Sequence, residues 1–216
     1  MQLTDEQIML LEQLTYLEDK VAREADVVLG PYDSVESLLR QFDEDALAEL
    51  EGSNEQFEGR ISGKQWAAII RQIQNDPELY SLDIAGKDDS VQAICFTDPN
   101  DSDSALVAFK GSTGQKEWQD NGSGLGLSDT QKQKEALEYI ENLSYDSITV
   151  TGHSKGGNKA QYVTVLSDKV DRCISMDGQG FSQEFLDKYY AEIEKKGGCI
   201  KNYFLDGDFV SILLFP

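Results

Sequence analysis

A five-residue motif in the second half of the chain has the residue types for nucleophilic chemistry. Residues 152–156 read Gly-His-Ser-Lys-Gly and match the pattern G-x-S-x-G. The β-branched segment 147–151 predicts a strand before the motif, and residues 157–166 predict a helix after it. This context places Ser154 on a sharp strand-to-helix turn, where its hydroxyl could attack a carbonyl carbon. The alternative is a glycine-rich turn whose serine has no chemical role.

Two main-chain donors beside such a serine could stabilise a developing oxyanion. A helix that begins after Ser154 points its first N–H groups and positive dipole end toward the serine, so the Lys155 N–H is one candidate. The apolar run 105–109 predicts a buried strand that ends in Lys-Gly-Ser, and a loop there can bring Ser112 opposite the turn. An ordinary strand-ending turn is the alternative for Ser112.

The elements that would position these residues alternate regularly along the chain. From residue 91 onward the pattern predicts a hairpin followed by helix, strand, helix, strand, helix and strand, which favours a mostly parallel sheet with helices on both faces. The predicted ranges are 91–96 and 105–109 for the hairpin, 128–141, 157–166 and 183–195 for the helices, and 147–151, 172–176 and 199–205 for the later strands.

The segment before residue 82 is predicted to be helical. Thr4 and Gln7 form a capping box, and apolar residues recur at helical spacing behind it as far as Val21. Further amphipathic helices are expected at 34–50 and 63–74. We expect these N-terminal helices to pack on the sheet. Residues 1–216 would then form a single domain, with a helical part at 1–80 and a sheet-and-helix core at 82–216.

The composition excludes several classes of partner. The net charge of -21 disfavours nucleic acid and anionic membrane surfaces. There is no signal-peptide pattern and no apolar stretch near the ~20 residues that span a bilayer, so we expect no transmembrane segment and a cytoplasmic location. Cys95, Cys173 and Cys199 are widely spaced, so we expect reduced core thiols and no metal site or cofactor. The oligomeric state stays open.

Two of these segments together resemble a known family. The strand end at 109–112 and the turn at 152–157 are similar to class 3, fungal-type lipases, in which the residue after the glycine serves the oxyanion hole. The wider resemblance is to a bacterial group of uncharacterised, lipase-like α/β-hydrolases and covers nearly the whole chain. Its most specific parts are Thr151–Asn158 and Met176–Ser182. The resemblance implies an α/β-hydrolase-like fold with Ser112 as the oxyanion residue.

The acid and the base of a catalytic triad are less well defined. Class 3 lipases carry their triad aspartate in a motif similar to the one at Asp208, so the resemblance favours Asp208, with Asp206 and Asp177 as alternatives. The one histidine, His153, adjoins the serine at a tight turn and is poorly placed to reach its hydroxyl. Lys155 would need a neutral amine and is a poor substitute.

In this fold a base histidine follows the acid, so we expect it downstream of Pro216. A truncated chain, inactive as printed, is therefore one interpretation, and a natural short form without hydrolase activity is the other. The expected function is hydrolysis of a small-molecule or lipid ester through a Ser154 acyl-enzyme. A non-catalytic binding protein on the same scaffold and an acyltransferase are the alternatives.

Overall fold

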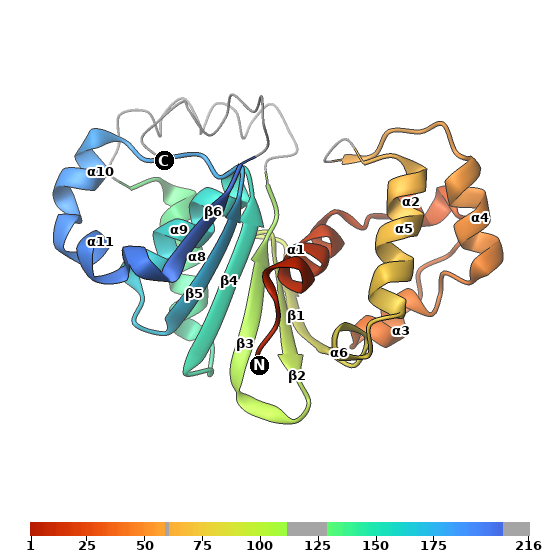
Figure 1. The fold of residues 1–216 in the computed structure, drawn as a ribbon, viewed down its shortest axis with the longest axis horizontal. Helices are drawn as coiled ribbons and strands as arrows, with labels where there is room; N and C mark the ends of the chain where they lie inside the picture. Colours follow the sequence, from red (N-terminus) through yellow and green to blue (C-terminus); the bar gives the residue numbers. More distant parts are fainter. Residues whose placement is uncertain (59–60, 112–128, 205–216) are drawn as a thin grey trace.

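A six-stranded sheet forms the centre of the fold. The computed structural model describes residues 1–58, 61–111 and 129–204 (Figure 1). The strands lie in the sheet in the same order as in the sequence. They are β1 Asp83–Asp88, β2 Ala93–Asp98, β3 Asp101–Phe109, β4 Ser147–His153, β5 Val170–Met176 and β6 Ile200–Tyr203.

The sheet is mostly parallel, as predicted. β2 pairs antiparallel with both β1 and β3, whereas β3, β4, β5 and β6 pair in parallel. Among these strands β2 alone therefore runs in the opposite direction. The register aligns Phe109 with Gly152, His153 with Met176, and Met176 with Tyr203. The carboxyl ends of four neighbouring strands thus meet at one edge, which confirms the predicted α/β-hydrolase-like architecture.

One face of the sheet is covered by helices from the second half of the chain. They are α8 Gln131–Asn142, α9 Lys155–Leu166, α10 Gln183–Lys188 and α11 Tyr190–Lys196. α9 contacts β3, β4 and β5 on one side and α8 and α11 on the other. Its apolar residues share a buried cluster with the facing strands. This central helix is enclosed almost completely, and it begins at the candidate serine turn.

The N-terminal helices lie on the opposite side of the sheet, and of these α1 packs directly across its strands. They are α1 Asp5–Gln13, α2 Asp19–Glu24, α3 Val35–Leu39, α4 Glu44–Gly52, α5 Gly63–Gln74 and α6 Pro77–Tyr80, with a 3-10 turn at Leu14–Tyr16. α1 lies across the sheet and contacts β3, β4 and β5, while α2 to α5 extend to one side (Figure 1). One buried cluster joins apolar residues of these helices to sheet residues such as Phe96, Leu106 and Ile174.

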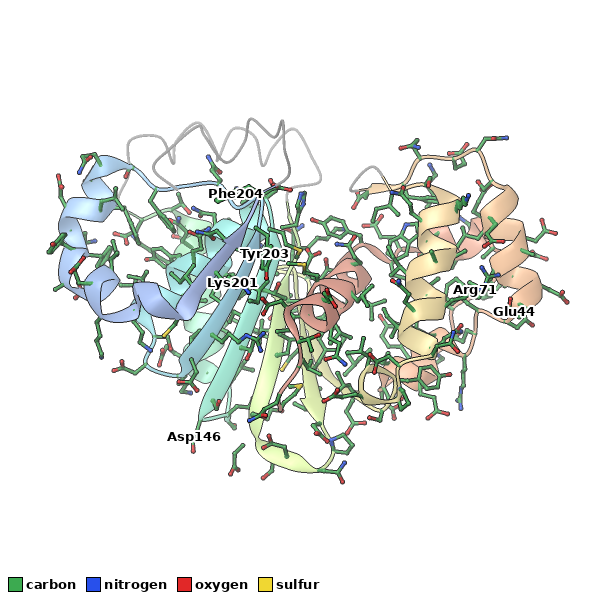
Figure 2. All side chains as sticks on the ribbon, viewed as in Figure 1. Glu44, Arg71, Asp146, Lys201, Tyr203 and Phe204 are labelled. Carbon is green, nitrogen blue, oxygen red and sulfur yellow. The ribbon has the colours of Figure 1, made fainter. Side chains whose placement is uncertain are left out.

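A charged cluster around Asp5 fixes α1 against the sheet. The Asp5 carboxylate accepts hydrogen bonds from Lys201 and Tyr203 of β6 and from Arg172 of β5. These bonds, with that from Lys201 the strongest, hold the pKa of Asp5 below its usual range. Lys201 and Tyr203 lie on β6, and Phe204 follows directly at its upper end (Figure 2). The start of α1 is thereby tied to two parallel strands.

Several predicted helices are divided in the structure. The Thr4–Gln7 capping box is present, but α1 passes into the 3-10 turn after Gln13, and the extended angles of Leu17 and Glu18 separate that turn from α2. The helix predicted at 34–50 is interrupted before Asp43, which caps α4 through the Ala46 N–H. The spacing of apolar residues shows which side of a helix is buried. It does not show where a side chain caps a new helix and so divides a longer helical pattern.

Other observed boundaries also differ from the predicted ones. The helix predicted from Ser128 begins at Gln131, and its capping box is made by Thr130 and Gln133; Ser128 itself lies outside the described residues. The helix predicted at 183–195 divides at Tyr189. β1 was not predicted, because its residues are half-buried or exposed and have no apolar run. The third predicted helix, α5, has the expected bounds.

The three cysteines are free thiols. Cys95 in β2 and Cys173 in β5 are buried, as their apolar surroundings predict, and Cys199 is half-buried. Burial raises the pKa of both Cys95 and Cys173 to about 12. Their thiols are therefore inert core groups.

Candidate functional site

Ser154 occupies a strained bend between β4 and α9. It is the residue between the last strand position, His153, and the first helix position, Lys155, and its backbone has φ 55° and ψ -118°. Such angles are rare for a residue with a side chain and cost about 1–3 kcal/mol. The Ser154 N–H donates to the Met176 carbonyl at 2.9 Å, and the Ser154 carbonyl accepts from the Asn158 N–H at 3.0 Å. These bonds maintain the bend.

The glycines on either side of the bend are required by close packing. A Cβ on Gly152 would lie 2.3 Å from the carbonyl carbon of Gly156, and a Cβ on Gly156 would lie 2.1 Å from the Phe109 oxygen. The turn therefore presses against its own first helical residues and against the end of β3. The spacing of G-x-S-x-G thus has a steric explanation in this chain.

A segment after β5 is held against the same turn. The Asn158 side chain donates to the carbonyls of Gln179 and Gly180 and accepts from the Gln133 side chain at 2.8 Å. Asn158 is buried, so these bonds satisfy an amide that would otherwise be costly. The two most specific segments of the sequence resemblance, 151–158 and 176–182, are therefore in direct contact.

The other predicted site residues fall into two groups. Lys155 is the first residue of α9 and is buried beside Ser154, so its backbone belongs to the turn. Ser112, Asp206 and Asp208 lie outside the described residues. The residue before Ser112 is described: a Cβ on Gly111 would lie 2.7 Å from the His153 oxygen. The end of β3 therefore reaches the turn.

Both ring nitrogens of His153 lie near polar groups of other segments. Its Nδ1 lies 3.3 Å from the Tyr16 hydroxyl, and its Nε2 lies 3.9 Å from Oδ2 of Asp177. Asp177, an alternative for the triad acid, is buried and has φ 45°. Its N–H donates to the Tyr203 carbonyl at 2.8 Å, which fixes it between β5 and β6. Asp177 thus faces His153 across the strand ends.

Glu12 of α1 is a buried acid that the sequence analysis did not single out. Its side chain is fully buried, and Gln13 Nε2 donates to it at 2.7 Å. Burial raises the pKa of Glu12 to about 8, against the weaker opposing effect of hydrogen bonds from the His153 backbone and Gln13. Its position four residues after Ile8, on the apolar side of α1, was a signal of this burial.

A cavity of about 390 Å³ lies where α1 meets the ends of β4, β5 and β6. Most of its lining is apolar or aromatic, and the residues with polar groups include Gln13, His153 and Asp177. Its size is at the lower end of the ~300–1,000 Å³ typical of small-ligand sites. The lining residues are Met9, Gln13, Tyr16, His153, Met176, Asp177, Tyr203 and Phe204.

Residues 1–58, 61–111 and 129–204 contain neither a candidate metal centre nor a membrane-spanning helix. This part of the chain contains no group of three or more His, Cys, Asp or Glu side chains arranged to hold a metal ion. No helix in the same ranges combines the length and apolar character needed to cross a bilayer.

Comparison with known proteins identifies one family and one solved structure. The family model described as Mbeg1-like matches residues 82–214, which is more than half of the chain. The solved structure is a fungal lipase–inhibitor complex presented as a model for interfacial activation in lipases; it aligns with a TM-score of 0.44 at 14% identity, over 62% of this chain and 61% of that one. This chain therefore spans less than two thirds of that lipase chain. The comparison with curated proteins finds no match.

Substitution of Gly156 tests the packing of the turn. Gly156→Ala should lower the free energy of unfolding by about 2 kcal/mol, because the new methyl group would overlap the Phe109 carbonyl. Gly52→Ala is the matched control, since a Cβ on that helical glycine meets nothing within 4 Å and alanine favours the helix. Urea denaturation measures both variants, and equal effects would contradict the steric explanation.

The buried carboxyl of Glu12 predicts a pH dependence of stability. The folded chain keeps a proton on Glu12 between about pH 4.5 and 8, whereas the unfolded chain releases it. The free energy of unfolding should therefore fall as pH rises through this window, and Glu12→Gln should remove that part of the decline. Urea denaturation at several pH values measures it, with the exposed Glu6→Gln as control; parallel curves for wild type and Glu12→Gln would refute the assignment.

Proposed function

The chain belongs to the Mbeg1-like family, and we propose that it acts as a serine hydrolase in which Ser154 attacks the carbonyl carbon of a carboxylic ester. The observation that carries this proposal is the backbone of Ser154, with φ 55° at the junction of a buried parallel strand and a buried helix. A strained conformation maintained by close glycine contacts on both sides is typical of a functional position.

The proposed reaction follows the general scheme of acyl-enzyme hydrolysis. Ser154 Oγ bonds to the carbonyl carbon while a base takes the hydroxyl proton, and the tetrahedral intermediate then expels the alcohol, which takes that proton. Water hydrolyses the acyl-serine by the same steps. The N–H groups of Lys155 and Ser112 would stabilise the oxyanion. The position of Lys155 at the start of α9, and the contact of Gly111 with the turn, support these roles.

The acid and base of this scheme are also part of the proposal. We assign the acid to Asp208, following the resemblance, and the base to a histidine outside the printed sequence. The contacts of His153 support this division, because its Nδ1 lies beside the Tyr16 hydroxyl and its Nε2 faces the Asp177 carboxylate. In this assignment Asp177 has a structural role, in which it joins the ends of β5 and β6, and it is not the triad acid.

The substrate is proposed to be a neutral or apolar ester. The cavity beside the turn has an apolar lining in which Asp177 supplies a carboxyl group, and the chain carries a net charge of -21. Both features disfavour a strongly anionic substrate. Hydrolysis and acyl transfer share the Ser154 acyl-enzyme and differ in whether water or another acceptor reaches it.

We also propose that residues 1–216 act as one domain in a reducing compartment such as the cytoplasm. A single buried cluster that includes both N-terminal helices and sheet residues supports the first statement. The three free thiols support the second.

Covalent labelling of the serine tests the proposal. A fluorophosphonate probe should label Ser154 in an active form of the chain, and Ser154→Ala should abolish labelling because no oxygen remains to attack phosphorus. Ser147→Ala is the matched control, since Ser147 lies at the opposite end of β4 and is exposed. Intact-protein mass spectrometry measures the adduct. Labelling that persists in Ser154→Ala would exclude Ser154 as the nucleophile.

The proposed source of the base is tested by the length of the chain. A longer chain that includes the residues encoded downstream of Pro216 should be labelled at least about 100-fold faster than residues 1–216. The reason is that loss of a triad member removes most of the reactivity of the serine. Asp208→Asn should slow labelling of the extended chain. If both folded forms stay unlabelled, the proposal fails, and a non-catalytic binding protein that uses the cavity becomes the better assignment.

A further inference from the structure

Tyr16 brings the N-terminal part of the chain into the candidate site. It ends the 3-10 turn Leu14–Tyr16 that follows α1, and its side chain is buried. The family model begins at residue 82, so Tyr16 lies outside the matched region. Its ring nevertheless lines the cavity together with His153 and Asp177.

The Tyr16 hydroxyl contacts the ends of two neighbouring strands at once. The Gly111 N–H, just beyond β3, donates to Tyr16 Oη at 2.9 Å in a buried hydrogen bond. The same oxygen lies 3.3 Å from Nδ1 of His153, the last residue of β4. The two rings also meet edge to face, with centroids 6.4 Å apart. A hydroxyl both donates and accepts, so it can serve both neighbours.

These two contacts adjoin the groups to which we assign chemistry. Gly111 directly precedes Ser112, and His153 directly precedes Ser154. There is no free space between the two strand ends, because a Cβ on Gly111 would lie 2.6 Å from Tyr16 Oη and 2.7 Å from the His153 oxygen. The Tyr16 hydroxyl therefore joins the two backbones just beyond Phe109 and Gly152, the last residues that pair β3 with β4.

We propose that Tyr16 is a positioning residue for this site, and that its hydroxyl sets the spacing between Gly111 and the turn at Ser154. The inference rests on the proposed function of Ser154. Attack and oxyanion stabilisation both depend on placing groups within a fraction of an ångström. A tether that joins the two backbones acts on that spacing without touching the substrate's reacting atoms.

The Tyr16 ring also has contacts that do not depend on its hydroxyl. Lys110 Nζ lies 5.4 Å from the centre of the Tyr16 ring and is itself paired with Glu18 and Glu58. Desolvation, which lowers the pKa of Lys110, is outweighed by these two carboxylates, so the pKa is raised and the amine stays charged. Tyr16→Phe keeps the ring and this cation–π contact, and it removes only the hydroxyl.

Hydrogen exchange provides the first test. In the printed chain, Tyr16→Phe should speed exchange of the Gly111 amide at least about tenfold, as measured by NMR, while amides in the middle of β4 keep their protection. The single histidine gives one set of imidazole signals, and these should shift in the same variant. Tyr162→Phe is the matched control, because it removes a buried hydroxyl bonded to Asp129 on the other face of the sheet. Unchanged Gly111 exchange in Tyr16→Phe would overturn the proposal.

Labelling kinetics in the extended chain provide the second test. Tyr16→Phe should lower the maximal rate of fluorophosphonate labelling about 10- to 100-fold and leave the probe concentration at half-maximal rate within about twofold. Tyr162→Phe should match wild type. An equal rate in Tyr16→Phe and wild type would overturn the proposal. If wild type itself is not labelled, the proposed function fails, and the Gly111 exchange result still decides whether Tyr16 sets this spacing.

Discussion

The contact between the turn at Ser154 and the end of β3 is the constraint on which the rest of the structure depends. Gly156 lies so close to the Phe109 carbonyl that the first turn of α9 packs directly on the end of β3, with no room for a side chain between them. With the turn in this position, Ser154 adopts its unusual backbone angles and α9 runs across β3, β4 and β5. The helix is then enclosed, and its polar side chains find their partners inside the protein.

Enclosure of α9 explains why so many of its polar residues are buried. Lys159 donates to the Val91 carbonyl at 2.9 Å, and Gln161 donates to the Ser175 hydroxyl at 2.9 Å. Asn158 adds bonds to Gln133 of α8 and to Gln179 after β5, so these side chains connect the helix to four separate places in the chain. Buried polar networks of this kind favour a single arrangement of a site, because a displaced group would lose its partner.

The sequence was most informative where a local rule applied. The turn at 152–156, the hairpin and α5 followed from glycine spacing, apolar runs and apolar residues at helical spacing, and each depends mainly on neighbouring residues. The contributions of Glu12 and Tyr16 were not predicted, because they depend on α1 lying across strands more than 90 residues away. Periodicity reveals which side of a helix is buried, but it does not reveal what that side will meet.

Ser112 and Asp208 show a different limit of sequence reasoning. Their proposed roles come from the resemblance, and both residues lie outside the described part of the chain. For Ser112 the structure supplies the position of its neighbour Gly111. For Asp208 the last described residue is Phe204, which follows β6 at the same sheet edge (Figure 2). The described chain therefore leads toward the site at Gly111 and again at Phe204.

The unequal burial of the three thiols has a practical consequence for spectroscopy. Cys95 and Cys173 are sealed within the sheet, where burial keeps their thiolates scarce, whereas Cys199 precedes β6 and is only half-buried. A maleimide dye or a nitroxide should therefore attach selectively at position 199 without any cysteine having to be replaced. The unaltered sequence thus offers an attachment point for a fluorescence or paramagnetic reporter beside the strand that helps to form the cavity.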